Sequence, residues 1–497
     1  MSPPQARVLD AWPELRPQAV ISAVPRASVR AAGRVEHDDD RVDTVDLRLT
    51  LGGVTLRRAV LGADEVWDIA VEPSPWWHSD CGRETRWWQE PAGAGPPAAL
   101  QGVLRGAGVE DLVDVRRRAR RWSIVRDDGR RGTAGDAAAS VVLEDILIGD
   151  QPVVTTVRIS GDAHLVEDLV SAFGAAGATE RTHTTALDVL AGRARPEIVT
   201  LEDLPPDPLA GHVVRRAVAA SVAKLLANDL AVRLRLGPEG VHQARVATRR
   251  LRSDLRTLGE LVDSTWASEL GEELRWLASA LGKVRDADVL GLRLQARLDT
   301  LEPAERELGA VLLDRLHESR NLDVCALDEA MSSERYAQLL DRLLTAARAP
   351  VLTEAAAGQA HAVLDTIAAR AWRPLEKAAK RARHDGEAAP IDEIHAVRIK
   401  AKRFRYAADA ASLVEPAAQR HARRIAALQD ELGELNDAAT AERWLRAQLT
   451  TGSADLAFVV GQLVGCERAE IQHRRQSWGA AWTAASRPRE RRWLARP

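Results

Sequence analysis

The periodicity of apolar residues changes near residue 200, and this change limits the folds open to the chain. Before it, apolar and polar residues alternate in short runs bounded by Gly, Pro and Asp, as in 42–60, 64–73 and 153–160. Period-two runs of this length are typical of antiparallel strands. Residues 47–58, with Gly52-Gly53 between two such runs, further predict a hairpin.

After residue 210 the chain is rich in Ala, Leu, Arg and Glu, with a period of about 3.6 residues that predicts helices packed into bundles. One more helix is expected in the first part, over 162–176. A proline-rich acidic stretch separates the two textures. We therefore predict a β domain over 1–192, a linker over 193–208 and a helical domain over 209–497. A chain of 497 residues, 45% of them hydrophobic, can build cores for two to three domains.

Composition excludes several classes of protein. No apolar run reaches the roughly 18 to 20 residues that a membrane span needs, and the first residues lack the basic and apolar segments of a secretory signal. The three cysteines form no CxxC pair, so we expect neither a disulfide framework nor a thiolate metal site. These features predict a cytoplasmic protein without membrane association. The net charge of -3 argues against a nucleic-acid coat protein but leaves room for a local basic patch.

The helical part contains an internal repeat. The segment VHQARVATRRLRSDL (241–255) resembles IHAVRIKAKRFRYAA (394–408), and the alignment places His242 opposite His395, 153 residues later. Self-similarity of this kind is typical of a duplicated structural unit.

A second pair of segments repeats at nearly the same spacing. LGKVRDADVL (281–290) resembles LGELNDAATA (432–441), 151 residues later. Two pairs at nearly one spacing indicate that a first half of about 209–350 is duplicated as about 351–497. Each half is then expected to form one helical bundle, with a pseudo-two-fold axis relating the two.

On a helix, the repeated segment has a polar face of a single sign. At about 100° per residue, its charged side chains fall within a wedge about 80° wide and apolar residues lie opposite. The set consists of His242, Arg245, Arg249, Arg252 and Arg256 in the first copy and His395, Arg398, Lys402 and Arg405 in the second. Like charges at this spacing repel by some tenths of a kcal/mol per pair. Forked guanidinium donors match phosphate oxygens, so the stripe predicts a site for a polyanionic phosphate.

Simpler interpretations of these residues stay open. The arginines could pair with acidic residues on neighbouring helices, such as Glu272 and Glu273, and the histidines could be structural or capping groups. No carboxylate or second histidine stands at metal-ligand spacing, so no metal site is predicted. Further anion contacts could come from Arg250, Lys283, Arg285 and Arg403, while Asp286 and Asp437 are expected to support the stripe from behind.

These motifs closely resemble the CHAD family, the conserved histidine α-helical domain. The matching segments are HQARVATRRLRSDLR, LGKVRDADVL, HAVRIKAKRFRYAAD and LQDELGELNDAATA, and the resemblance covers about 205–497. It implies a pair of four-helix bundles with pseudo-two-fold symmetry around a basic groove, and binding of inorganic polyphosphate or association with polyphosphate granules. The binding residues that it carries over are His242, Arg245, Arg249, Arg252, His395, Arg398, Lys402 and Arg405.

The N-terminal part resembles a degenerate CYTH domain, the triphosphate tunnel fold. VDTVDLRLTLGGVTLRR, GRETRW and VDVRRRARRW match strands of that family and imply an antiparallel β-barrel. The family's E-x-E-x-K motif is missing before residue 45, and Ala70 stands where the family has lysine. Triphosphate hydrolysis needs a divalent metal held by carboxylates, so we expect no catalytic residues and no cofactor.

The chain is therefore predicted to be an α+β multidomain protein that binds inorganic polyphosphate without catalysis, in the cytoplasm or on polyphosphate granules. One alternative is a metal-dependent triphosphatase of the CYTH type, which requires carboxylates that the sequence lacks. Another is a nucleic-acid-binding protein, for which no helix-turn-helix, aromatic RNA platform or zinc finger is visible. The sequence carries no signal of oligomeric state.

Overall fold

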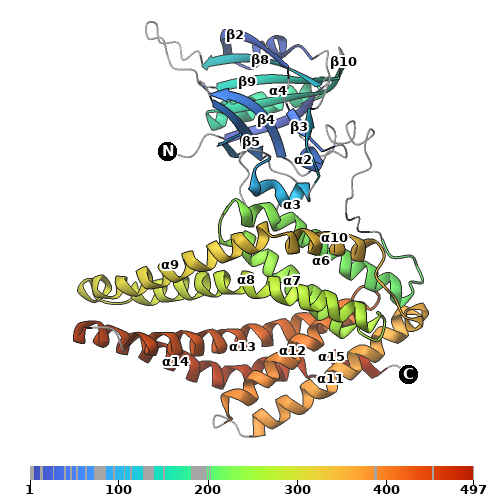
Figure 1. The fold of residues 1–497 in the computed structure, drawn as a ribbon, viewed down its shortest axis with the longest axis vertical. Helices are drawn as coiled ribbons and strands as arrows, with labels where there is room; N and C mark the ends of the chain where they lie inside the picture. The colour runs from blue at the N-terminus through green and yellow to red at the C-terminus, as the bar shows by residue number, and fades with distance from the viewer. Residues whose placement is uncertain are drawn as a thin grey trace. The chain divides into compact units, whose positions relative to one another are not determined.

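The chain divides by its internal contacts into two units, Met1–Glu197 and Ile198–Pro497, drawn in Figure 1. The computed structural model describes residues 5–11, 15–25, 27–38, 41–44, 48–51, 54–61, 64–71, 86–92, 96–105, 107–111, 115–126, 139–148, 151–180, 199, 201, 203–384, 389–449 and 453–495. The start of the predicted linker, 193–198, lies outside these residues. In the part of the chain that the structure describes, every helix is too short or too polar to cross a bilayer.

The first unit contains two antiparallel sheets. In spatial order, the larger sheet consists of β11 (Thr179–Glu180), β1 (Gln5–Ala11), β10 (Gln151–Gly161), β9 (Ala139–Ile148), β8 (Val115–Arg126) and β2 (Ala27–Asp38). The smaller sheet consists of β6 (Arg86–Pro91), β5 (Asp64–Val71), β4 (Val54–Leu61), β3 (Arg41–Asp43) and β7 (Glu110–Asp111). The helices of this unit are α1 (Pro17–Ser22), α2 (Arg48–Leu51), α3 (Gln101–Leu104) and α4 (Ala163–Ala175), with a 3-10 turn η2 at Ala98–Leu100.

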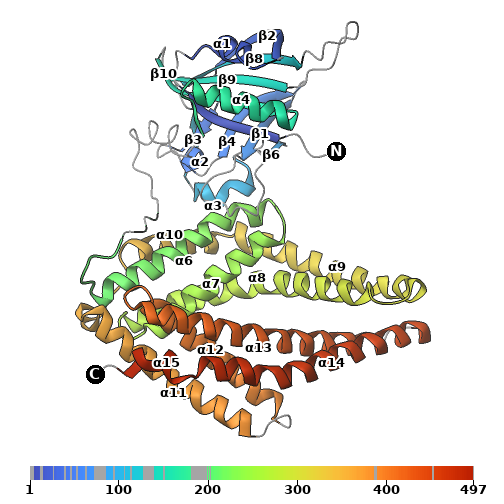
Figure 2. The ribbon, with the colours of Figure 1, turned by 180° about the vertical axis from the view of Figure 1, so that it is seen from behind.

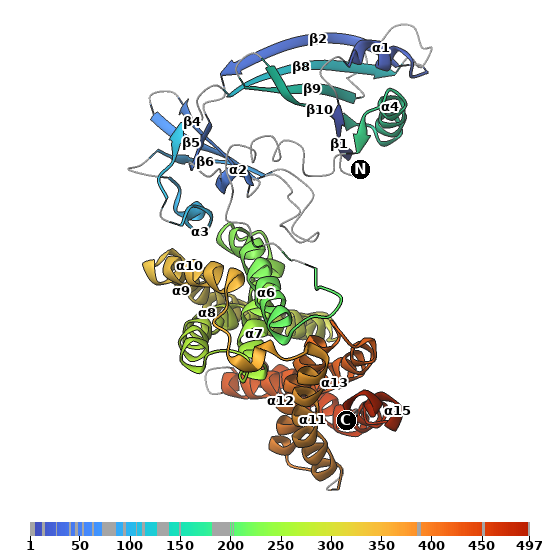
Figure 3. The same ribbon diagram turned by 90° about the vertical axis from the view of Figure 1, so that its right-hand side faces the viewer.

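The predicted closed barrel is not found. Among the described residues, β11 and β2 are the edges of the larger sheet and β6 and β7 those of the smaller, and no ladder joins these edges. A barrel requires every strand to have two neighbours. The predicted helix over 162–176 is present as α4, whose Leu165, Leu169 and Phe173 are buried against the larger sheet (Figure 3).

The first arm of the predicted hairpin over 47–58 is wrong, because it forms the short helix α2 and β4 pairs with β3 instead. Asp43 Oδ1 accepts hydrogen bonds from the backbone N–H groups of Thr44 (2.7 Å) and Leu49 (2.8 Å). Thr44 Oγ1 accepts from the N–H of Arg48 at 3.0 Å. These side chains satisfy backbone donors locally, as helix caps do, and so favour a helical turn over a strand.

The second unit is helical, as predicted. Its first half consists of α6 (Ala210–Arg233), α7 (Pro238–Thr257), α8 (Ser264–Leu298), α9 (Pro303–Ser332) and α10 (Glu334–Arg348). Its second half begins with the 3-10 turn η3 (Glu354–Ala357) and continues through α11 (Ala360–His384), α12 (Ile391–Ala411), α13 (Pro416–Gln448), α14 (Ala454–Ala485), α15 (Pro488–Arg491) and the 3-10 turn η6 (Arg492–Ala495). The order of short and long helices therefore repeats along the chain.

The two halves share their hydrophobic cores instead of building one each. The main cluster includes Leu251 and Leu340 of the first half together with Leu364 and Phe404 of the second. A further cluster joins α8, α9, α13 and α14, whose long helical hairpins lie side by side in Figures 1 and 2. The halves are consequently one folding unit with a common interior.

Two reciprocal backbone hydrogen bonds link equivalent points of the halves. The N–H of Ala210 donates to the carbonyl of Gly358 at 2.8 Å, and the N–H of Ala360 donates to the carbonyl of Pro208 at 2.9 Å. Ala210 and Ala360 each begin the first helix of their half, and they stand 150 residues apart, close to the spacing of the sequence repeat. Reciprocal contacts of this kind are typical of two units related by a two-fold axis.

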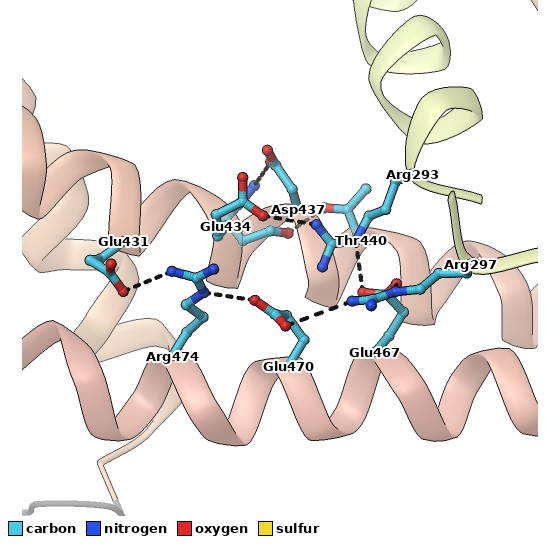
Figure 4. A network of polar contacts seen from close by, with 10 residues as sticks. Arg293, Arg297, Glu431, Glu434, Asp437, Thr440, Glu467, Glu470 and Arg474 are labelled. Atoms are coloured by element: carbon cyan, nitrogen blue, oxygen red, sulfur yellow. Dashed lines mark hydrogen bonds and ion pairs between the residues drawn. The ribbon is translucent and has the colours of Figure 1, made fainter. Parts of the chain in front are cut away.

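A buried carboxylate ties the two long hairpins together (Figure 4). Glu467 of α14 has a fully buried side chain (0% exposed) and accepts from Nε of Arg293 at 2.7 Å and Nε of Arg297 at 3.0 Å, both on α8. Arg293 also reaches Glu434 of α13 at 3.0 Å, and Arg297 lies 3.7 Å from Glu470 of α14. Since a buried charge persists only when it is paired, these ion pairs fix how the hairpins meet.

Replacing Glu467 by Ala should lower the thermal midpoint of the protein by about 5–10 °C, because two arginines lose a buried partner at a cost of about 3 kcal/mol. Circular dichroism of the full chain measures this midpoint. Glu434→Ala is the matched control, since this carboxylate is 49% exposed and should contribute less than about 1 kcal/mol. Equal effects of the two substitutions would contradict the structural role of Glu467.

Candidate anion-binding site

The predicted basic stripes lie on α7 and α12, which contact each other across the two halves. Gly237, at φ 126°, and Pro238 precede and open α7, and Pro390 precedes α12. Glycine tolerates the positive φ and proline favours the first helical position, so the start of α7 is set locally. The apolar face of each helix is buried, through Ala244, Ala247, Leu251 and Leu255 of α7 and Val397, Ala401, Phe404 and Ala408 of α12. The cationic faces of the two helices are therefore not part of the hydrophobic core.

Five cations from the two helices converge, and we call them the basic cluster: Arg245, Arg249, Arg398, Lys402 and Arg405. The pKa of Lys402 indicates that these cations lie close together. Its burial, followed by the charges of Arg398, Arg249, Arg245 and Arg405, lowers the pKa of Lys402 to about 7. Part of each stripe thus lies beside part of the other, which brings cations of both halves together.

Acidic neighbours neutralise only part of this charge. Arg245 Nη1 lies 2.8 Å from Asp286 Oδ1 of α8. Asp437 of α13 acts on Arg398 in the equivalent position, but burial together with Arg249 and Arg245 still leaves the pKa of Arg398 lowered. Each helix therefore has one aspartate partner, Asp286 for Arg245 of α7 and Asp437 for Arg398 of α12.

Three guanidinium groups of the cluster keep unused donors. The Nε atoms of Arg249, Arg398 and Arg405 are buried and have no hydrogen-bond partner. A buried donor without a partner costs free energy, of order 1–3 kcal/mol. An anion that enters the cluster would accept these hydrogen bonds and recover that cost.

The two histidines are not equivalent in their surroundings. His242 is half-buried, and its pKa is lowered first by burial and then by Arg285, Lys224 and Arg249, against the opposing effect of Glu239. It is therefore a neutral donor or acceptor at pH 7. His395 is exposed on α12. The charge of Arg285 acts on His242, so Arg285, suggested above as an additional anion contact, lies near this histidine.

Arg250 has a structural role instead of the anion contact suggested for it. Its Nε donates to Asp254 at 2.9 Å, its Nη1 donates to Asp409 at 2.6 Å, and its guanidinium lies 5.0 Å from the ring centre of Tyr406. Asp254 belongs to α7, whereas Asp409 and Tyr406 belong to α12. These contacts link the two helices and use the donors that a phosphate would need.

The remaining candidates are not among the cations that lower the pKa of Lys402. The pKa of Arg252 is lowered by burial and by the charges of Arg275 and Arg256, while Glu272 opposes this shift. Since Arg275 and Glu272 belong to α8, Arg252 faces α8. Arg256, Lys283 and Arg403 are exposed. Glu272 and Glu273, considered as partners of the stripe, pair instead with Arg275 (2.6 Å) and Arg335 (2.7 Å).

A cavity of about 340 Å³ adjoins the cluster and contains a cation that sequence reasoning missed. Lys224 of α6 lines it together with Arg249 and Arg405, and burial lowers the pKa of Lys224 against the effect of Glu239. One signal was available in the sequence. Arg216, Ala220 and Lys224 recur every four residues, which puts two cations and a small residue on one helical face.

The described residues include no group of three His, Cys, Asp or Glu side chains placed to hold a metal ion. The CYTH resemblance of the first unit stays a prediction.

Comparison with known proteins places the second unit in a family. The CHAD domain family matches residues 216–446. Two uncharacterized proteins from Mycobacterium tuberculosis strains, MT2285 and Rv2226, are each 31% identical over 404 residues, covering 74% of this chain and 74% of their own. Among solved structures, PptA from Streptomyces chartreusis is 25% identical with a TM-score of 0.46, covering 55% of this chain and 99% of that one. The CHAD domain from Ricinus communis is 24% identical with a TM-score of 0.47, covering 58% and 95%. The family match shows that residues 216–446 form a CHAD domain, and the chain belongs to the same family as the two mycobacterial relatives, with which it shares most of its length.

Proposed function

We propose that the basic cluster binds inorganic polyphosphate and that it does so without catalysis. The observation that carries the proposal is the convergence of Arg249, Arg398 and Lys402 from two helices into one incompletely neutralised site. The family resemblance of the repeated motifs implies the same ligand. Association with polyphosphate granules, which that resemblance also implies, is part of the proposal.

A polymer of phosphates suits this site better than a single anion. The unused Nε donors belong to both halves, with Arg249 on α7 and Arg398 and Arg405 on α12. Consecutive phosphates could therefore accept from both helices, and each charge-assisted hydrogen bond would contribute about 1.5–3 kcal/mol. Neutral His242 could donate a further hydrogen bond without adding to the repulsion.

Replacing Arg249, Arg398 and Lys402 together by Ala should weaken polyphosphate binding by at least about 100-fold, because three charged donors are lost. Isothermal titration of the full chain with polyphosphate of defined length measures this change. The helical fold should persist, since the substitutions also remove mutual repulsion among the cations.

The matched control replaces Arg256, Lys377 and Arg403 by Ala, which removes the same number of charges from exposed positions that are not part of the basic cluster. This variant should bind within about threefold of wild type, and only the cluster variant should lower the slope of log affinity against log salt by about one per lost contact. Equal weakening in both variants would mean that binding depends on overall charge and not on the cluster.

Polyphosphate affinity should fall by about tenfold between about pH 7 and about pH 9. The pKa of Lys402 is about 7 in the free protein, and a bound polyanion raises it by favouring the charged form. Binding in this window therefore takes up a proton, so it weakens as pH rises. Lys402→Arg, which stays charged, should bind with little pH dependence here, and an unchanged pH profile in this variant would rule out Lys402 as the titrating group.

A further inference from the structure

The cavity beside the basic cluster differs chemically from the cluster itself. It lies among α6, α7 and α12, has a volume of about 340 Å³, and falls within the range of small-molecule sites. Positive charge comes from Arg216 and Lys224 of α6, Arg249 and Arg250 of α7, and Arg405 of α12. Two of these cations, Arg249 and Arg405, belong also to the basic cluster, so a phosphate group could lie against both.

Further along the same helices the cavity presents acceptors. Asp254 stands five residues beyond Arg249, about 7.5 Å along α7, and Asp409 stands four residues beyond Arg405 on α12; both line the cavity. Asp254 Oδ2 accepts from Arg250, but Asp254 Oδ1 is buried without a hydrogen-bond partner, on a side chain that is only 2% exposed. Burial raises the pKa of Asp254 to about 6, so the group is a carboxylate above that pH.

An inorganic phosphate chain does not suit this acceptor end. Arg250 also lines the cavity and pairs with both Asp254 and Asp409. Ionised phosphates bring only acceptors, so they would leave Oδ1 of Asp254 without a donor. A buried acceptor is stabilised by an N–H or O–H donor. The group that fills this end should therefore carry such donors.

Much of the remaining lining is apolar and includes several small side chains. It consists of Ala217 and Ala220 of α6, Val246 and Ala247 of α7, Tyr406 and Ala410 of α12, and Leu413, which follows α12. Small residues leave room for a ring system, and apolar surface favours carbon over phosphate. The cavity thus combines a cationic end, an apolar wall and an acceptor end.

We propose that the cavity binds the nucleoside part of a nucleoside 5′-polyphosphate, with N–H or O–H donors directed to Asp254 and the phosphates placed against Lys224, Arg249 and Arg405. This inference rests on the proposed function, because the phosphates would occupy part of the basic cluster. It extends that function from inorganic polyphosphate to phosphate chains that end in an organic group.

The test compares ATP with inorganic tripolyphosphate by isothermal titration of the full chain, without divalent metal, at one salt concentration and at a pH above 7. ATP should bind about tenfold more tightly than tripolyphosphate, as one hydrogen bond to a buried carboxylate would provide. Asp254→Asn, which places an amide at the acceptor position, should remove this preference while tripolyphosphate binds as well as before or better.

A second variant does not depend on the Arg250 contacts. Ala220→Trp fills the cavity from an exposed position on α6, and should weaken ATP about tenfold while changing tripolyphosphate by less than about twofold. Ala310→Trp, at an exposed position on α9, is the matched control and should change neither.

The two proposals can fail separately. Long-chain polyphosphate that binds wild type while ATP shows no advantage over tripolyphosphate would overturn the cavity assignment alone. Equal loss of both ligands in Ala220→Trp would overturn it as well. Failure of long-chain polyphosphate to bind would overturn the proposed function, and ATP binding that is sensitive to Ala220→Trp would then assign the cavity as a site of its own.

Discussion

The helical unit holds several positive charges close together, and their mutual repulsion has to be balanced by other interactions. Burial, followed by the nearby charges of Arg398 and Arg249, lowers the pKa of Lys402 to about 7. The opposing forces come from packing. A hydrophobic core runs through both halves, and Arg250 joins α7 to α12 through Asp254 and Asp409. The proposed binding of a polyanion would therefore meet cations that packing already holds in place, with little need for reorganisation.

Neighbouring arginines of α7 make different contacts. Arg250 donates to Asp254 and Asp409 and so links α7 to α12. The buried Nε of its neighbour Arg249 has no hydrogen-bond partner. The equivalent position in the second half, Arg403, is exposed. The duplicated segments have therefore taken different roles around an approximately symmetric site.

Helical periodicity was sufficient to predict the two stripes, but not which of their members meet. A wedge about 80° wide is broader than the line along which two helices touch, so Arg245 and Arg249 join the cluster while Arg252 turns toward Arg275 of α8. Lys224 was missed because the neighbours of α6 depend on tertiary packing. In the first unit, alternation predicted strands, yet strand partners are set by long-range pairing, and local caps from Asp43 and Thr44 replaced one predicted strand by a helical turn.

The reciprocal hydrogen bonds of Ala210 and Ala360 have a consequence for how such a chain can hold together. Each half supplies a donor that only the other half satisfies, and their apolar side chains complete a common interior. The contact is in effect a dimer interface enclosed within one polypeptide. Covalent linkage makes the association intramolecular, so its strength no longer depends on how much protein the cell contains.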